Sequence, residues 1–462
     1  MFNLIFLVTF SLILLFLNIY CFIKKKYLYL FVPCMLFLPD YYGIEFSKAL
    51  PLLTVSRIMF LIFYIYAYIN RKKQISIKKI RLKSIPCYYY FLFGYFFFRF
   101  VANIYYISIY KDAIKTTFEI FFEQLLFLVA IYLLAPTKNE IITIIKIIVW
   151  TAFAFFIIGI LESFTFFRPF DALYTVTRFM HNQHFVRLGL LRSTTTFGLP
   201  GFYGNMCLLM FPLITYIYNL NKSKKYLVIL FFDILALIHS GSRADIIFLL
   251  ILTTIYLVHN LIEKKILSYL KIFAIILTSL IIFITSLSLV NNTYKYFYFG
   301  VIKSTLNELG FDFDLNQVSS SEDNYFGENN DYGTESRLVQ FTGIIHTLRI
   351  NPLFGLGSKP LSRNAVSYYS FNKWHTAKAF DVGVVEVICS EGFIGLIAHI
   401  FLFIFFVCYL NSISRHAYPF FYSHIYFLII SYLLCILGTA NMYSFLILII
   451  FLLLGYTQFC AQ

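Results

Sequence analysis

The chain has 462 residues, of which 60% are hydrophobic and only 13% are charged. Apolar runs close to the ~20 residues that span a bilayer recur along most of its length, so the composition predicts a multi-spanning membrane protein. The net charge of +15 would suit a nucleic-acid partner, but no RNA or DNA module is visible. Short basic loops on the cytoplasmic side of a membrane explain this charge better, and no nucleic acid is expected to bind.

The predicted spans follow one another from the first residues to the last. In chain order they are residues 2–22, 27–40, 48–70, 86–108, 113–135, 141–162, 197–219, 226–240, 245–262, 271–291, 381–410, 420–437 and 443–459. The second is short for a span, so an all-α, polytopic integral membrane protein with about 12 or 13 transmembrane helices is expected.

Basic clusters set the expected orientation of the spans. They lie at residues 24–26, 71–83, 222–225 and 264–265 and at Arg415, and placing all of them in the cytoplasm makes the spans alternate. The chain then divides into three parts. These are a helix bundle over 1–291 with an outer loop at about 163–196, a large periplasmic loop over 292–380 that contains short helices, and C-terminal transmembrane helices over 381–462.

The large loop is a polar island whose charges are sorted. Every charge over 308–335 is acidic, and every charge over 337–378, including Arg349 and Lys378, is basic. Arg337 begins an amphipathic stretch that predicts a short helix on the membrane. His375 lies just before the next span and is a proton acceptor by type, although a lone loop histidine is more often incidental.

The turn Ser240-Gly241-Ser242-Arg243 joins two spans at the outer face. A glycine between serines permits a tight reversal, and Arg243 at a helix start offers a planar fork for an oxyanion. The simpler interpretation is an arginine that reaches lipid headgroups. Arg187 and Arg192 in the other outer loop are expected on the same face, with Arg192 the better candidate because it is closer to a glycine turn.

Several charges fall inside predicted spans. Arg99 and Glu119 lie at nearly the same depth of the bilayer and are expected to pair, for function or for packing and insertion. Glu123 is one turn deeper, and Asp233 is isolated in mid-span. The pair Asp312 and Asp314 has the spacing of a metal-binding motif but lies well before the Arg337 helix, so no metal or other cofactor is expected.

The order of these motifs resembles the O-antigen polymerase and ligase family. The resemblance covers residues 185–400. It rests on the Gly-Ser-Arg turn, the Arg337-led helix, an Asn-Pro-x-x-Gly-x-Gly turn from Asn351, the histidine before the next span, and a Glu-Gly-x-x-Gly entry at Glu391. Family members usually carry asparagine directly after the histidine, whereas this chain has Thr376.

The resemblance implies a metal-independent bacterial glycosyltransferase of the GT-C kind in the inner membrane, with its active site on the periplasmic side. Its donor would be an undecaprenyl-diphosphate-linked oligosaccharide. Arg243 and Arg337 would hold the diphosphate and His375 would activate the acceptor hydroxyl, with Arg187, Arg192, Ser242, Arg349 and Lys378 as further binding residues. A chain-length regulator and a flippase of the same pathway are possible partners.

Three functions remain open on the sequence. A polymerase would add the glycan to the sugar of another lipid-linked repeat unit, and the polar loop favours it. A ligase would add the glycan to lipid A core. A lipid-linked oligosaccharide flippase would instead line a central cavity with polar residues from many helices, rather than gather them in outer loops.

Overall fold

A computed structural model describes residues 2–46, 51–72, 86–177, 184–262, 266–311, 313, 337–370, 372–377, 380–412, 419–438 and 442–460. Lys378, Asp312, Asp314 and most of the acidic half of the island lie outside these residues.

Helices dominate the described chain. They are α1 (Phe2–Ile23), α2 (Tyr27–Phe37), α3 (Val55–Ile69), α4 (Cys87–Ile104), α5 (Lys111–Glu119), the π-helix η3 (Ile120–Leu125), α6 (Leu126–Leu134), α7 (Lys138–Thr165), α8 (Pro200–Asn221), α9 (Lys225–Ser240), α10 (Arg243–Ile262), α11 (Ile266–Val290), α12 (Asn292–Glu308), α13 (Arg337–Ile350), α14 (Gly383–Ser412), α15 (Pro419–Gly438) and α16 (Tyr443–Cys460). Short 3-10 turns are η4 (Pro169–Leu173) and η6 (Pro360–Arg363).

Within the described residues, the strands form three small antiparallel pairs. They are β1 (Gly43–Ile44) with β2 (Leu53–Thr54), β3 (Val186–Arg187) with β4 (Leu190–Leu191), and β5 (Ser367–Ser370) with β6 (Lys373–Thr376).

The predicted all-α, polytopic membrane protein is confirmed. Among the described residues, eight helices are long and apolar enough to cross a membrane, counting α5, η3 and α6 as one. Three shorter apolar helices, α2, α3 and α16, lie beside them. Each predicted span coincides with a helix, so the difference from the expected 12 or 13 comes from helices that are too short or too polar to qualify alone.

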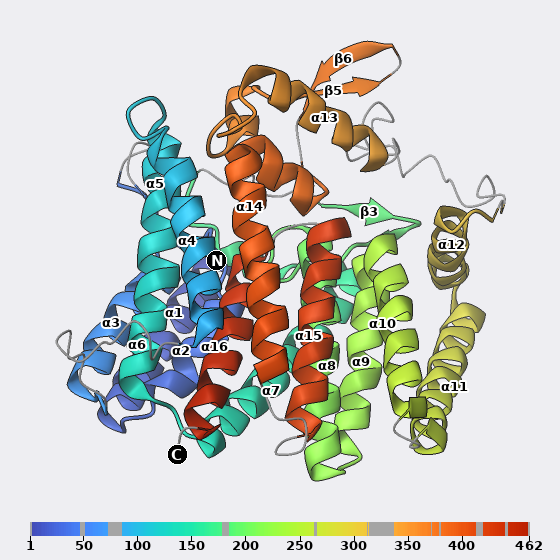
Figure 1. Ribbon diagram of the computed structural model, residues 1–462. Coiled ribbons are helices and arrows are strands. Elements are labelled where there is room, and N and C mark those ends of the chain that lie inside the picture. Colours follow the sequence, from blue (N-terminus) through green and yellow to red (C-terminus); the bar gives the residue numbers. More distant parts are fainter. Residues whose placement is uncertain are drawn as a thin grey trace.

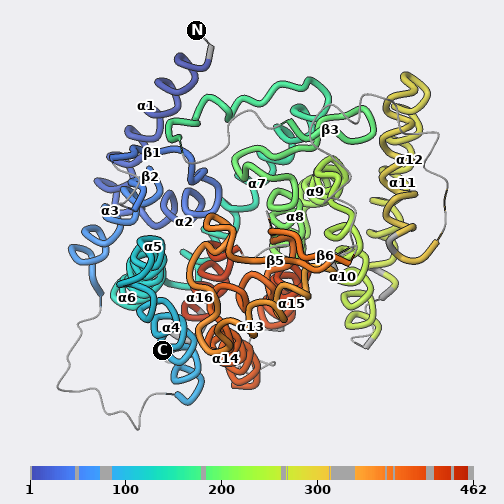
Figure 2. The backbone as a smooth tube through the Cα atoms, turned by 90° about the horizontal axis from the view of Figure 1, so that it is seen from above, coloured from blue at the N-terminus to red at the C-terminus, as the bar shows by residue number. Residues whose placement is uncertain are grey.

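The two ends of the bundle differ in character. The α6–α7 and α8–α9 junctions lie at the lower end in Figure 1, and the second of these carries the basic residues 222–225. The α9–α10 turn, β3, α13 and the β5–β6 hairpin lie at the opposite end, called here the upper end. From above, the N-terminal helices and α11–α12 stand at opposite sides of the bundle, with α8 and α14–α16 between them (Figure 2).

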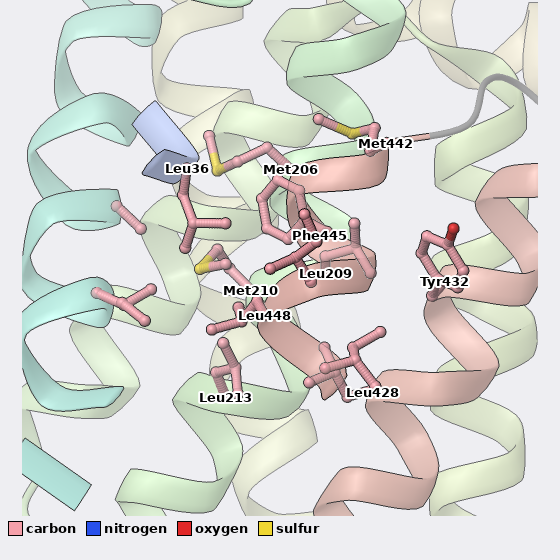
Figure 3. Packing of buried hydrophobic residues seen from close by; sticks show 14 of the residues in the cluster. Leu36, Met206, Leu209, Met210, Leu213, Leu428, Tyr432, Met442, Phe445 and Leu448 are labelled. Atoms are coloured by element: carbon pink, nitrogen blue, oxygen red, sulfur yellow. The ribbon is translucent and has the colours of Figure 1, made fainter. Parts of the chain in front are cut away.

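The packed core centres on α8. In the most apolar stretch of α8, 83% of the residues are buried inside the protein, compared with 11% in the corresponding stretches of α1 and α11. The α8 side chains Met206, Leu209 and Met210 lie in a packed cluster with Phe445 of α16 (Figure 3). Because hydrocarbon lipid is as apolar as these side chains, close packing rather than water exclusion holds such helices together.

Helix α14 breaks at Gly392, close to its upper end. Gly392 has φ 63° and ψ −153°, a region that is essentially restricted to glycine. The loop after α13 fills the break, since Phe393 N donates to Pro352 O (2.9 Å) and Leu356 N donates to Cys389 O (2.8 Å). The loop backbone therefore replaces hydrogen bonds that α14 lacks at this point.

Replacing Gly392 by alanine is expected to destabilise the protein by about 1–3 kcal/mol or more. A Cβ atom there would lie 2.4 Å from Gly355 N, in addition to the unfavourable backbone conformation. Gly201 is the matched control, because a Cβ atom at that position meets nothing within 4 Å. Thermal unfolding in detergent should show a lower midpoint for Gly392→Ala only, and equal midpoints for the two variants would contradict this account.

Candidate functional site

The turn between α9 and α10 gathers arginines from two parts of the chain. Gly241 ends α9 in the left-handed conformation (φ 62°), which lets the chain reverse directly into Arg243 at the start of α10. Ser240 Oγ accepts a hydrogen bond from Ser242 N at 3.1 Å and so fixes the turn. Ser242 is buried, and Arg243 is half-buried.

The hairpin β3–β4 brings the other two arginines to this turn. Arg187 Nη1 donates to Gly241 O at 2.8 Å, and Arg192 Nε donates to Ser240 O at 2.9 Å. Arg187 and Arg192, the two predicted cations of the outer loop, therefore both hydrogen-bond to the turn that precedes Arg243. With the N-terminal end of α10, three guanidinium groups and a positive helix end share one region of the upper face.

The segment that carries Arg192 is anchored from below. Glu162, near the end of α7, accepts hydrogen bonds through Oε2 from Thr194 N (3.2 Å) and Thr195 N (2.9 Å). Ser193 Oγ donates to Gly159 O at 2.6 Å. Hydrogen bonds from two backbone amides to one carboxylate are strong, so they fix the position of the segment that follows Arg192.

The second group of predicted residues lies on α13 and the β5–β6 hairpin. Arg337 is the first residue of α13, Arg349 is exposed in its last turn, and His375 lies in β6 opposite Tyr368. The hairpin is fastened to α13, because Tyr369 N donates to Thr342 Oγ1 at 2.7 Å.

Alternation along the hairpin sets the direction of His375. Tyr368 packs in a small cluster with Val366 and Cys389, and its cross-strand partner His375 is on the same face. His375 is half-buried, so it is held on the side of the hairpin that packs toward α14. Burial raises the pKa of the Tyr368 hydroxyl, which therefore stays protonated beside the histidine.

The predicted site residues thus form two sets. Arg187, Arg192, Ser242 and Arg243 meet at the α9–α10 turn, whereas Arg337, Arg349 and His375 belong to a cap formed by α13 and the hairpin over α14. From above, the hairpin extends from α13 toward α10 (Figure 2), and Figure 1 shows it above that side of the bundle.

Arg363, one of the basic residues of the island, is held by contacts within the loop after α13. Arg363 Nη2 donates to Leu356 O at 2.6 Å and its Nη1 to Ser358 O at 2.8 Å, while its Cζ lies 3.8 Å from the ring centroid of Tyr110. This arginine therefore holds the loop that fills the break in α14.

The predicted pairing of Arg99 with Glu119 is wrong. Arg99 Nη2 lies 3.0 Å from Glu391 Oε1, and the two side chains are only 3% and 6% exposed. Glu119 and Glu123 instead contact Arg57, at 2.7 and 2.6 Å. Equal depth in the membrane does not fix the direction in which a side chain points around its helix, and Arg99 points to α14.

The Arg99–Glu391 pair extends to the upper loops. Asn103 Nδ2 donates to Glu391 Oε1 at 3.1 Å, and Ser358 Oγ donates to Asn103 Oδ1. Tyr443 at the start of α16 accepts from Arg99 Nη2 at 3.0 Å. Arg99 and the Glu391-Gly392 dipeptide each stand out in the sequence, but no sequence signal joins two residues that are 292 positions apart.

The fold and these two sets of residues define a polytopic membrane protein whose upper face carries clustered arginines below a histidine-bearing cap. Residues 227–400 match the family model described as O-Antigen ligase. The match confirms the resemblance to the O-antigen polymerase and ligase family, and supports a membrane enzyme that acts on lipid-linked sugars. It spans Arg243, α13, His375 and Glu391. No curated protein and no solved structure matches the chain.

Proposed function

We propose that the protein is an O-antigen polymerase. In this reaction an undecaprenyl-diphosphate-linked glycan is transferred to a sugar of a second lipid-linked repeat unit. We place the reaction at the upper face and assign that face to the periplasmic side of a bacterial inner membrane. The observation that carries the proposal is the convergence of Arg187, Arg192 and Arg243 on one turn at the start of α10.

The arginine cluster suits a diphosphate leaving group. As the glycosidic C–O bond to the diphosphate breaks, negative charge builds on the departing oxygen. Guanidinium groups that are already in position stabilise this charge more in the transition state than in the ground state. In the proposed reaction these groups neutralise the diphosphate without a metal ion, and Ser242 is assigned a hydrogen bond to it.

The cap would supply the acceptor side of the reaction. His375 takes the proton of the acceptor hydroxyl while that oxygen forms the new C–O bond, and lipid diphosphate leaves. Arg349, exposed in the last turn of α13, adds positive charge above the bundle, and Arg337 and Lys378 are proposed as further substrate-binding residues. In the proposed complex the cap and the arginine turn bind the lipid-linked substrates from opposite sides.

Replacing His375 by alanine is expected to lower kcat by about 10²–10⁴-fold, the usual contribution of a general base. His375→Gln should be equally inactive, because glutamine keeps a polar side chain but does not accept a proton at neutral pH. Protein level and oligosaccharide ladders in a complemented deletion strain measure the effect. Normal ladders with either variant would remove His375 from the proposed chemistry.

A ligase is the second candidate, because the matching family model carries that description. The polar and aromatic sequence of the island's acidic half, over 308–335, favours the polymerase, because such side chains can hydrogen-bond and stack on a glycan. Deleting the protein distinguishes the two: loss of a polymerase leaves one repeat unit on the lipid A core, whereas loss of a ligase leaves none. A flippase and a chain-length regulator of the same pathway are the proposed partners.

A further inference from the structure

The outward face of the β5–β6 hairpin carries two exposed aromatic side chains. Tyr369 and Trp374 are direct cross-strand partners, with ring centroids 5.3 Å apart and an interplanar angle of 59°. They are 42% and 45% exposed. The chain holds only two tryptophans in total, so an exposed tryptophan at this position calls for a physical reason.

The β5–β6 hairpin is short, but its strand pairing and its packing against α13 hold it in place. Four residue pairs align its strands, and α13 packs along β5. The His346 ring lies 5.5 Å from that of Trp374, between centroids, and buttresses it from α13. Burial and the nearby Arg349 guanidinium lower the pKa of His346, so its imidazole is uncharged at neutral pH and packs as an aromatic ring.

Lipid contact does not account for these two rings. Aromatic side chains of membrane proteins gather at the bilayer interface, level with the ends of the spans. The β5–β6 hairpin instead stands at the extreme upper end, beyond the upper ends of α10 and α15 (Figure 1). Two large aromatic surfaces held in water and preorganised by a hairpin are typical of a binding surface.

A pyranose ring has the complementary chemistry. One of its faces presents C–H groups, which stack on the electron-rich face of an aromatic ring, while its edge presents hydroxyl groups. Asn372, exposed at the hairpin turn, carries an amide group that can hydrogen-bond such hydroxyls.

We propose that Tyr369 and Trp374, with Asn372 at the hairpin turn, form a platform on which a pyranose of the glycan stacks. The inference rests on the proposed function and adds a site separate from the diphosphate site. Successive strand residues point to opposite faces, so the platform faces away from His375. It therefore holds a sugar remote from the reacting bond and contributes to binding of the growing chain more than to the chemical step.

The chain's two tryptophans allow a direct binding test. In a Trp150→Phe variant, Trp374 is the only tryptophan, because Trp150 lies in α7 within a span. The full-length variant in nanodiscs is titrated with the water-soluble repeat-unit oligosaccharide released from the producing strain's surface polysaccharide. A saturable change in Trp374 emission is expected. Unchanged Trp374 emission on addition of the oligosaccharide would overturn the proposal. An equal change in Trp374 emission when phosphatidylglycerol is added to the nanodiscs without oligosaccharide would also overturn it, because it would mark a lipid contact.

Kinetics give a second, independent readout. Trp374→Ala and Tyr369→Ala are each expected to raise KM by about 2- to 10-fold with a smaller effect on kcat, as loss of one aromatic stacking contact implies. Trp374→Phe should restore most of the affinity, and Trp150→Phe is the control with normal kinetics. Unaltered KM and chain length in both alanine variants would refute the platform while leaving the polymerase intact. Absence of transfer by the wild-type protein would refute the proposed function itself.

Discussion

Arg243→Ala is expected to lower kcat for glycan transfer by at least about 10²–10³-fold, the usual cost of removing one preorganised donor to a developing negative charge. Arg243→Lys should recover part of the rate, because lysine keeps the charge but loses the planar fork that binds two phosphate oxygens. The measurement is the rate of chain extension by purified protein at saturating lipid-linked substrate.

The control for Arg243 is Arg71→Ala. Arg71 is an exposed arginine whose Cζ lies 4.7 Å from the ring centroid of Tyr68, and it follows α3 in one of the basic clusters assigned to the cytoplasm. Its replacement is expected to leave the rate normal. Equal rates for the Arg71 and Arg243 variants would show that the arginine turn does not bind the leaving group. Arg187 and Arg192 are less informative, because each also supports the turn itself.

Glu391→Gln is expected to destabilise the protein by about 3–5 kcal/mol, because it leaves the buried Arg99 guanidinium without a counter-charge. The damage should spread to the loop over 351–358, which is tied to the pair through Asn103 and Ser358. Thermal unfolding in detergent measures the loss, and amide hydrogen exchange of the loop locates it. Transfer should fall in parallel, since this loop supports the cap.

Lys72→Gln provides the matched comparison, because the Lys72–Glu140 pair is exposed, at 51% and 36%. Its loss should cost at most about 1 kcal/mol. The double variant Arg99→Glu with Glu391→Arg restores an ion pair with the charges exchanged. It should therefore be more stable than either single variant, Arg99→Glu or Glu391→Arg, when Tyr443 and Asn103 still hydrogen-bond to the exchanged pair. A Glu391→Gln protein as stable as the wild type would show that the pair does not hold the loop.

Hydropathy and basic clusters were sufficient to predict the spans and the common side of the arginines. The spans follow from the lengths of apolar runs, and the sidedness follows from the positions of lysine and arginine, so both can be read directly along the sequence. The break at Gly392 was not predicted, because Glu391-Gly392 reads as an ordinary helix entry until the loop from Pro352 is seen to fill it.

Contacts between distant segments could not be predicted in the same way. Arg99 and Glu119 share a depth, yet the faces of α4 and α14 decide that Arg99 meets Glu391. The signal available was a glutamate followed by Gly392 and Gly395 near the upper start of a span, which places a carboxylate where an intramembrane arginine could meet it. Charge sorting likewise groups Arg363 with the other basic residues of the island, whereas its guanidinium group holds the loop that fills the break in α14.

The most direct test of the central claim uses the purified protein in proteoliposomes with an undecaprenyl-diphosphate-linked, isotopically labelled repeat unit. The account predicts new glycosidic bonds, seen as a ladder of longer lipid-linked glycans, with one free undecaprenyl diphosphate released for each bond formed. Labelled repeat units that cross the bilayer without any glycosidic bond forming would contradict it and would identify the protein as a transporter.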